Sequence, residues 1–259
     1  MQATKPDGRR NDSFVEAFAK GLHVIRSFPL EKPFATLAEV ATIADLPRAT
    51  VRRMLLTLVE LGYVTQQDDP FSLAPRLLDL GFSYLSSIPL YRTAQDVLER
   101  LASDLNELCS LSVLDGPETI YLVRVQGRDF LSRGMGVDTR LPVYATSMGR
   151  VLMADMDKTQ RERLLRGTKL LKRTPKTIVD WPTLHARADA AKKDGFSLVI
   201  GELEEGIIGL SVPVKDRLGK VVATASISFN PVRFKKQEAL AAYLPKLREA
   251  AEMIAYSVT

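Results

Sequence analysis

Residues 36–63 predict two short helices joined by a tight turn, and this unit constrains what the surrounding chain can form. Apolar residues recur at helical spacing in both halves, at positions 37, 40, 41 and 44 and then at 51, 54, 55, 58 and 61. Between these stripes Pro47 ends the first helix and suits the first turn of the second, because proline lacks the N–H that a helix interior needs. Each helix can bury one face, so the pattern predicts a helix-turn-helix.

The second helix of this unit has a basic surface near its start. Arg48, Arg52 and Arg53 lie away from the apolar stripe, and residues 46–59 include no acidic residue. Such a helix fits the major groove of DNA, where the fork of an arginine binds a phosphate or the acceptor edge of guanine. The predicted DNA-binding residues are Arg48, Ala49, Thr50, Arg52 and Arg53. The alternative is a basic amphipathic helix that only covers a core.

The flanking segments complete a winged helix over residues 1–74. Residues 14–28 predict an amphipathic helix that supplies the third wall of a small core. Its apolar residues are Phe14, Ala17, Phe18, Leu22, Ile25 and Phe28. Residues 64–66 and 71–73 predict a short hairpin directly after the helix-turn-helix, which is the arrangement of a winged helix.

The basic charge of the chain does not lie in this predicted DNA-binding domain. The formal net charge is +5, yet the first 90 residues hold ten basic and ten acidic residues. DNA binding is therefore argued from where arginines cluster, in the second helix and in a polar arm of residues 1–12 with Arg9 and Arg10. The hairpin tip carries Asp68 and Asp69, which repel phosphates, so we expect it to contribute less than the helix and the arm.

Composition and cysteine content favour a cytoplasmic globular protein. Hydrophobic residues make up 46% and charged residues 26% of the 259, which suits one large or two modest domains with their own cores. No apolar run approaches the roughly 20 residues of a membrane span, and the polar start lacks the apolar segment of a secretory signal. The single cysteine excludes an internal disulfide. We expect a cytoplasmic location and no membrane contact.

Residues 75–90 predict an apolar linker helix between the winged helix and the rest of the chain. Pro75 opens this helix and Pro89 stops it. Its apolar residues are Leu77, Leu78, Leu80, Phe82, Leu85 and Ile88. A helix with so few polar faces must pack against something. A second copy of the chain and the helix's own domain are the two alternatives.

Residues 91–259 predict an α+β domain in which helices cover one curved antiparallel sheet. The helices are expected over residues 91–108, 158–166, 182–194 and 236–256. The strands are expected over residues 110–114, 119–126, 130–134, 196–200, 210–214 and 221–229. Residues 146–150 precede an apolar run and predict a helix start, where free backbone N–H groups accommodate an anion.

The sequence contains no catalytic or metal-binding constellation. Cys109 is flanked by Leu108 where a helix meets a strand, and we expect it in the core. His23 and His185 are isolated, so neither a catalytic triad nor a set of metal ligands can be assembled around them. No glycine pattern of a nucleotide-binding loop occurs. The sequence therefore predicts neither an enzyme nor a bound cofactor.

Three segments resemble the IclR family of transcriptional regulators, in the same order along the chain. They are ADLPRATVRRMLLTLVELGYV, TRLPVYATSMGRVLMA and GLSVPVKDRLGKVVATASIS. The middle segment is similar to the branch that contains PcaR, PcaU and PobR, which governs the catabolism of aromatic acids. The resemblance implies a winged helix, a dimerising linker helix and a C-terminal GAF-like effector-binding domain. It also implies a homodimer or tetramer on palindromic, double-stranded promoter DNA.

The resemblance further implies a pocket for a small-molecule effector, an aromatic or keto acid, in the second domain. Carried over by position, the lining residues are Ser147, Met148, Glu202, Gly209, Ser226 and Ser228. Glu202 shares a loop with Glu204 and Glu205, which is typical of a solvated segment unless Glu202 turns inward.

The carboxylate of such an effector needs a charged partner, because a bare buried carboxylate is very costly. We predict Arg133 for this role, since it lies near the end of a strand just before a Gly-Met-Gly turn. The N–H groups of Ser147 and Met148 are expected to add hydrogen bonds. The alternative is that Arg133 is solvated on an outer face of the strand.

Two classes of function remain open from the sequence. The favoured one is a ligand-responsive, DNA-binding transcriptional regulator of aromatic-acid catabolic genes of the β-ketoadipate type. The alternative is a small-molecule enzyme or a non-DNA sensor whose winged helix serves protein interaction. The arginine cluster favours the first class, and the missing catalytic constellation weakens the second.

Overall fold

The computed structural model describes residues 13–29, 31–68, 70–88, 90–127, 139–230 and 236–257. The chain divides into two compact units, Met1–Tyr84 and Leu85–Thr259. Within the described ranges, no helix is long and apolar enough to span a membrane. The predicted polar arm, with Arg9 and Arg10, lies outside the described residues.

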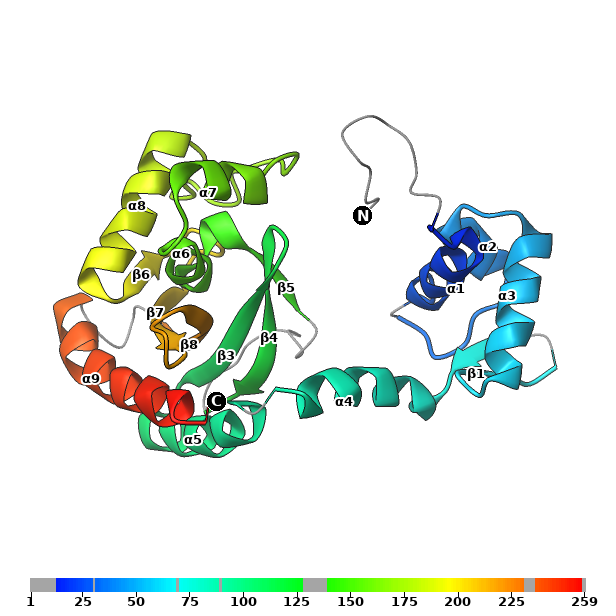
Figure 1. The fold of residues 1–259 in the computed structure, drawn as a ribbon, viewed down its shortest axis with the longest axis horizontal. Coiled ribbons are helices and arrows are strands. Elements are labelled where there is room, and N and C mark those ends of the chain that lie inside the picture. Colours follow the sequence, from blue (N-terminus) through cyan, green and yellow to red (C-terminus); the bar gives the residue numbers. More distant parts are fainter. Residues whose placement is uncertain are drawn as a thin grey trace. The chain divides into compact units, whose positions relative to one another are not determined.

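The first unit has the element order of a winged helix, as the sequence predicts. Its elements are α1 (Glu16–Arg26), α2 (Leu37–Ala44), α3 (Arg48–Glu60), β1 (Val64–Gln66) and β2 (Phe71–Leu73) (Figure 1). The two strands pair antiparallel, with Val64 opposite Leu73. The core of this unit joins all three helices to the hairpin, and it is built around Val24, Val40, Val51, Leu55 and Phe71.

Local interactions fix both ends of α2. The Thr36 hydroxyl oxygen accepts the Glu39 N–H at 3.3 Å, and the Glu39 carboxylate accepts the Thr36 N–H at 2.8 Å, which together form a capping box. At the other end Asp45 adopts a left-handed backbone with φ of 49°, and its N–H bonds back to α2. The ring Nε2 of His23 lies 2.9 Å from the Ala44 carbonyl oxygen, so α1 is tied to the turn of the helix-turn-helix.

Helix α1 buries less of its apolar surface than the sequence predicts. Phe14, Phe18 and Leu22 are 49, 68 and 44% exposed, whereas Val24 and Phe28 are buried. The segment carries two apolar rows. The one with Val24, Ile25 and Phe28 packs in the core of this unit, and the one with Phe14, Phe18 and Leu22 does not. The expectation that the other row belongs to the core was wrong, because spacing alone does not distinguish the two.

The predicted apolar linker forms a short 3-10 turn, η1 (Pro75–Leu77), followed by α4 (Leu78–Ser86). The last residues of the segment, Leu85 and Ile88, pack against the core of the second unit. Four apolar side chains of α4 remain largely exposed: Leu78, Leu80, Phe82 and Tyr84.

The second unit is built on a six-stranded antiparallel sheet. The strand order is β5-β4-β3-β8-β7-β6. The bounds are β3 (Leu108–Asp115), β4 (Glu118–Val125), β5 (Arg140–Pro142), β6 (Ser197–Ile200), β7 (Ile208–Lys215) and β8 (Val221–Phe229). In the described part of this unit the helices that accompany it are α5 (Leu90–Leu105), α6 (Ser147–Met153), α7 (Lys158–Leu164), α8 (Trp181–Asp194) and α9 (Lys236–Ala255), with the 3-10 turn η2 (Val143–Ala145) before α6. This is the α+β architecture that the sequence predicts.

The two faces of this sheet differ in chemistry. One face is apolar and packs on α5 and α9, and its central residues include Leu210, Val212, Ala225 and Ile227. Figure 1 shows α6, α7 and α8 on the other side of the sheet. Because successive residues of a strand point to opposite faces, the intervening residues Gly209, Ser211, Ser226 and Ser228 lie on the side of α6.

Three details of the second unit differ from, or fall outside, the prediction. The helix expected over residues 91–108 ends at Leu105, and Leu108 already begins β3. Strand β5 was not predicted, because three residues are too few to show an alternation. The strand expected over residues 130–134 lies outside the described residues.

Candidate functional site

The candidate DNA-reading surface is the outer side of α3. Arg48, Arg52 and Arg53 are exposed, while Val51 and Leu55 on the opposite side of the helix are fully buried. Ala49 is exposed and Thr50 is half-buried. With the residues that the structure describes, none of the three guanidinium groups forms an ion pair or a side-chain hydrogen bond. Helix α3 therefore presents three arginines to solvent, and no described side chain competes for them.

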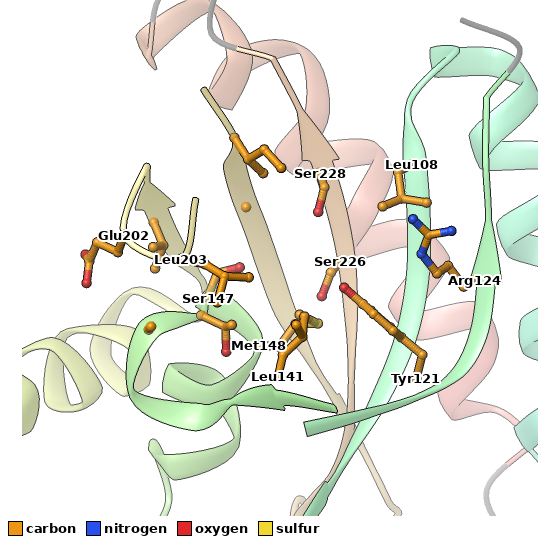
Figure 2. A pocket seen from close by; sticks show the side chains of 15 residues that line it. Leu108, Tyr121, Arg124, Leu141, Ser147, Met148, Glu202, Leu203, Ser226 and Ser228 are labelled. Carbon is orange, nitrogen blue, oxygen red and sulfur yellow. The ribbon is translucent and has the colours of Figure 1, made fainter. Parts of the chain in front are cut away.

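A cavity lies in the second unit between the polar face of the sheet, α6 and the loop after β6 (Figure 2). Its lining comprises Leu108, Tyr121, Arg124, Leu141, Ala145, Thr146, Ser147, Met148, Val199, Glu202, Leu203, Ile207, Gly209, Ser226 and Ser228. Six predicted effector-binding residues are among them: Ser147, Met148, Glu202, Gly209, Ser226 and Ser228. The structure thus brings these six to one cavity, while Arg133 lies outside the described residues. Their binding role stays a prediction.

The sequence interpretation missed the charged end of this cavity. Figure 2 shows the Arg124 guanidinium between Leu108 and Tyr121, on the side of the cavity remote from Glu202. The guanidinium carbon lies 6.0 Å from the centre of the Tyr121 ring. Burial lowers the pKa of Arg124 from its usual value, and burial raises the pKa of Tyr121 to about 12. Among the described residues that line the cavity, Arg124 alone carries a positive charge.

A β-bulge explains why Arg124 was missed. Strict alternation would place Tyr121 and Arg124 on opposite faces of β4. In the structure Leu111 pairs with Val123 and the next residue, Ser112, pairs with Tyr121, so Leu122 has no partner in β3. The extra residue brings Tyr121 and Arg124 to the same face. A lone arginine in a strand gives no sign of such a bulge in the sequence.

Glu202 turns inward, which decides between the two alternatives left open for it. Its carboxylate accepts a hydrogen bond from Arg150 at 2.6 Å and one from the Ile178 N–H at 3.3 Å. Both partners of this ion pair are almost fully buried. In Figure 2 the carboxylate points away from the other lining residues. Glu202 therefore fastens the loop after β6 to α6, whereas Glu204 and Glu205 of the same loop are exposed.

Close packing sets the position of α6 over the sheet. The Thr146 hydroxyl caps the helix by accepting the Gly149 N–H at 3.0 Å. A Cβ at Gly149 would lie 2.0 Å from the Val143 carbonyl oxygen, so only glycine allows this approach. The side chain of Met148 is held as well, because its Sδ accepts the Ser112 hydroxyl at 3.1 Å. Ser147 and Met148 are thus presented to the cavity from a fixed helix start.

The described residues show no group of three or more side chains suited to hold a metal ion. Cys109 is buried on the apolar face of β3, and burial raises the pKa of its thiol to about 12, which makes it an unreactive core residue. His185 stacks on Trp181 with ring centroids 5.6 Å apart and is not among the residues that line the cavity.

Comparison with known families covers both units of the chain. Residues 17–68 match the IclR helix-turn-helix domain, and residues 82–256 match the family described as bacterial transcriptional regulator IclR C-terminal. The chain belongs to the IclR family. It is therefore a DNA-binding transcriptional regulator with an effector-binding domain, not an enzyme, and the cavity lies in the domain that binds small molecules in this family.

Among its relatives in the IclR family are regulators of aromatic catabolism. The Pca regulon regulatory protein of Pseudomonas putida is 36% identical over 95% of this chain and 84% of its own length. The p-hydroxybenzoate hydroxylase transcriptional activator of Acinetobacter baylyi is 31% identical over 93% of this chain and 91% of its own length. These relatives confirm the resemblance to the PcaR and PobR branch.

A solved structure of an IclR homologue adds a ligand to this comparison. The protein from Microbacterium hydrocarbonoxydans, crystallised with 4-hydroxybenzoate, is 27% identical and aligns with a TM-score of 0.82. The alignment covers 94% of this chain and 99% of that one. Both the winged helix and the curved antiparallel sheet are thus shared with a protein of this family.

Proposed function

We propose that this regulator reads promoter DNA through α3 and responds to an aromatic acid bound in the cavity of its second unit. The observation that carries the proposal is the composition of the cavity, which has a cation at one end and mainly apolar or hydroxyl-bearing side chains elsewhere, while the one lining carboxylate, Glu202, is paired with Arg150. The relatives that control aromatic catabolism support the same class of effector. We infer that the controlled genes serve aromatic-acid breakdown of the β-ketoadipate type, in the cytoplasm.

The cavity suits an aromatic carboxylate. The carboxylate would pair with Arg124, whose partial burial makes an ion pair stronger than it would be in water. The ring would pack against Leu141 and Met148, which line the same space. Ser226 and Ser228 would face the polar substituents of the ring. Arg133 remains the second candidate for the charged partner.

Removal of the Arg124 charge is expected to weaken binding of a carboxylate specifically. Arg124→Met should raise the dissociation constant of 4-hydroxybenzoate by roughly 30-fold or more, because losing one side of a buried charge pair costs about 2–5 kcal/mol. Isothermal titration calorimetry on the full chain measures this. A keto acid without a ring should bind the unchanged protein more weakly than the aromatic acid.

Arg140→Met is the matched control for this experiment. Arg140 lies on the neighbouring β5, where its guanidinium is exposed and pairs with Asp115 at 2.7 Å and Glu118 at 3.3 Å. This variant removes a nearby positive charge without touching the cavity lining. An equal loss of affinity in both variants, or none in Arg124→Met, would place the anion site elsewhere, with Arg133 next to be tested.

The DNA-reading role of α3 has its own test. Alanine at Arg48, Arg52 and Arg53 together should abolish operator binding, because it removes the contacts of α3 with phosphates and bases. The slope of log K against log salt should fall as well, since it is proportional to the number of phosphate contacts. A single Arg52→Ala should cost about 1–3 kcal/mol if Arg52 reads a base. Fluorescence anisotropy with the DNA upstream of the operon, at several salt concentrations, measures both effects. Unchanged binding by the triple variant would refute the assignment.

We further propose that the regulator acts as a homodimer or tetramer. The proposal rests on α4, whose Leu78, Leu80, Phe82 and Tyr84 are all more than half exposed in the single chain. Such a concentration of apolar surface on one short helix marks an interaction site. Two copies would also supply the two α3 helices that a palindromic site requires.

A further inference from the structure

A row of polar side chains crosses the sheet beneath the cavity. Strand register aligns one residue from each of five strands: Arg124 in β4, Ser110 in β3, Ser226 in β8, Ser211 in β7 and Ser197 in β6. Residues directly opposite one another in a sheet point to the same face. The charged end of the cavity and the lining residue Ser226 thus belong to one line across the polar face.

Ser211 joins two of the lining hydroxyls from behind. Its Oγ lies 2.7 Å from Ser147 Oγ on α6 and 2.8 Å from Ser226 Oγ on β8. Ser147 and Ser226 line the cavity, whereas Ser211 is completely buried and does not. The three hydroxyls form one continuous series of hydrogen bonds, which connects two walls of the cavity through a residue that is not itself part of the lining.

Gly209 makes room for this series of hydroxyl hydrogen bonds. It precedes Ser211 by two residues on the same face of β7, and a Cβ there would lie 2.7 Å from Ser147 Oγ. A side chain at this position would displace Ser147 from its hydrogen bond with Ser211. The glycine therefore leaves room for the hydroxyl of α6 to reach the sheet.

Counting hydrogens shows what the chain offers to a ligand. Each hydroxyl has one hydrogen to donate and two lone pairs to accept. The two bonds of the chain use two of its three hydrogens, and the third resides on Ser226 or on Ser147 according to the direction of the chain. If Ser147 and Ser226 both donated to Ser211, the hydrogen of Ser211 would have no acceptor among the three hydroxyls, and a buried unpaired donor is costly. The cavity therefore receives one donor and one acceptor.

A neutral hydroxyl is the ligand group that matches such a pair. It donates one hydrogen and accepts another, whereas a carboxylate only accepts and a bare ring carbon does neither. The strand spacing fits this as well: neighbouring strands lie about 4.8 Å apart, so the backbones at Arg124 and Ser226, two strands apart, are separated by about 10 Å. A ring fits between a carboxylate at the first residue and a hydroxyl at the second.

We propose that Ser211 is a positioning residue that makes the regulator selective for hydroxylated aromatic acids over their unsubstituted counterparts. It does so by ordering the donor and acceptor of Ser147 and Ser226 at the end of the cavity remote from Arg124. This inference rests on the proposed function, since it concerns the same cavity and the same class of effector.

The test compares three probes on the full chain by isothermal titration calorimetry: benzoate, 3-hydroxybenzoate and 4-hydroxybenzoate. The unchanged protein should bind the better hydroxybenzoate about tenfold more tightly than benzoate, as expected for one satisfied hydrogen-bonding group. Ser211→Ala should reduce this preference to about twofold or less while the dissociation constant of benzoate changes by less than about threefold. Ser211→Cys fills the same space with a weaker hydrogen-bonding group and should give an intermediate preference, which keeps the test usable if alanine impairs folding.

Thr224→Val is the control for loss of a buried hydroxyl. Thr224 lies two residues from Ser226 on the same face of β8. Its hydroxyl donates to the Val212 carbonyl oxygen at 2.9 Å and is not hydrogen-bonded to Ser147, Ser211 or Ser226. This variant should leave the preference for a hydroxyl unchanged.

Two results would count against the proposal, and they can be told apart. If the unchanged protein binds none of the three probes, the proposed class of effector is wrong and the inference falls with it. If the unchanged protein binds them but shows no preference, or if Ser211→Ala weakens all three by one factor, the effector class stands and Ser211 has only a structural role.

Discussion

Gly209 shows how a single residue decides what the cavity of this regulator can hold. The family resemblance assigns Gly209 to the cavity lining. Its physical role depends on the distance between β7 and α6, and the periodicity of a sequence does not predict that distance. The same is true of Arg124, whose face is set by the bulge at Leu122. On a regular strand, by contrast, alternation alone orients Ser226 and Ser228 to one face, and the structure has both in the cavity lining to which the resemblance assigns them.

Gly209→Ala is expected to weaken both the second unit and its ligand binding. The new Cβ would lie 2.7 Å from Ser147 Oγ, so α6 or β7 must shift, and overpacking of this kind costs about 1–3 kcal/mol. Thermal unfolding and calorimetry with 4-hydroxybenzoate measure the two effects.

Gly21→Ala provides the comparison for this glycine. In α1 the added Cβ would meet Met54 Sδ at 3.9 Å, an ordinary contact, and alanine favours a helix, so stability should rise by up to about 1 kcal/mol. A Gly209→Ala protein as stable and as tightly binding as the unchanged one would show that α6 adjusts freely.

At the scale of elements, helices with strong local signals were the most predictable. The apolar stripes of α2 and α3 appear where the sequence predicts them, except that Leu61 lies just beyond α3 and is 50% exposed. Helix α8 likewise begins at a clear local signal, because the Asp180 carboxylate accepts the Thr183 N–H at 2.9 Å. Strand β5 was not predictable because three residues are too few to show an alternation. The exposed row of α1 was not predictable because it is as apolar as the buried row.

Acid should destabilise the first unit, because it protonates the Glu39 carboxylate of the α2 capping box. A hydrogen bond from Lys32, followed by those from Thr36, lowers the pKa of Glu39 from 4.5 to about 2. The folded pKa is depressed, so this stabilisation is fully present above pH 4.5 and is lost as the pH falls toward 2. Thermal unfolding followed by circular dichroism should show a Glu39→Gln protein that is less stable than the unchanged one at pH 6, with the difference shrinking by pH 3.

Lys32→Met isolates the first of these causes. It removes the partner that lowers the pKa of Glu39 most and leaves the Thr36 bonds in place. Its stability difference from the unchanged protein should shrink over the same range of pH. A difference for Glu39→Gln that stays constant down to pH 3 would contradict a charged role for this carboxylate.

At the scale of the whole molecule, each unit has its own core, and α4 connects them with an apolar exterior. The division into a reader unit and an effector unit follows from the sequence, because a helix-turn-helix pattern and a strand-rich pattern are easily told apart. The oligomeric state is harder to predict from the sequence, because an exposed apolar helix indicates that it has a binding partner but not which one.

Charges introduced into α4 are expected to dissociate the assembly. Leu80→Glu combined with Phe82→Glu should shift the protein toward monomer in sedimentation velocity at micromolar concentration, because two carboxylates cannot be buried without partners. Leu218→Glu is the control, since Leu218 is 94% exposed in the turn between β7 and β8. A protein that is already a stable monomer before substitution would refute the proposed dimer.

The alternation of the sheet also has a consequence for how such regulators diversify. Positions that shape the cavity and positions that hold α5 and α9 alternate along β7 and β8, so a substitution in one set need not touch the other. Mutations at Ser226 and Ser228 can change ligand choice while Leu210, Val212, Ala225 and Ile227 keep the apolar face of the sheet packed, whereas Gly209 must stay because a Cβ there meets Ser147. A library randomised at Ser226 and Ser228, with Gly209 kept, would therefore search new inducers while the close approach of α6 to β7 is preserved, which makes this domain a practical starting point for biosensors.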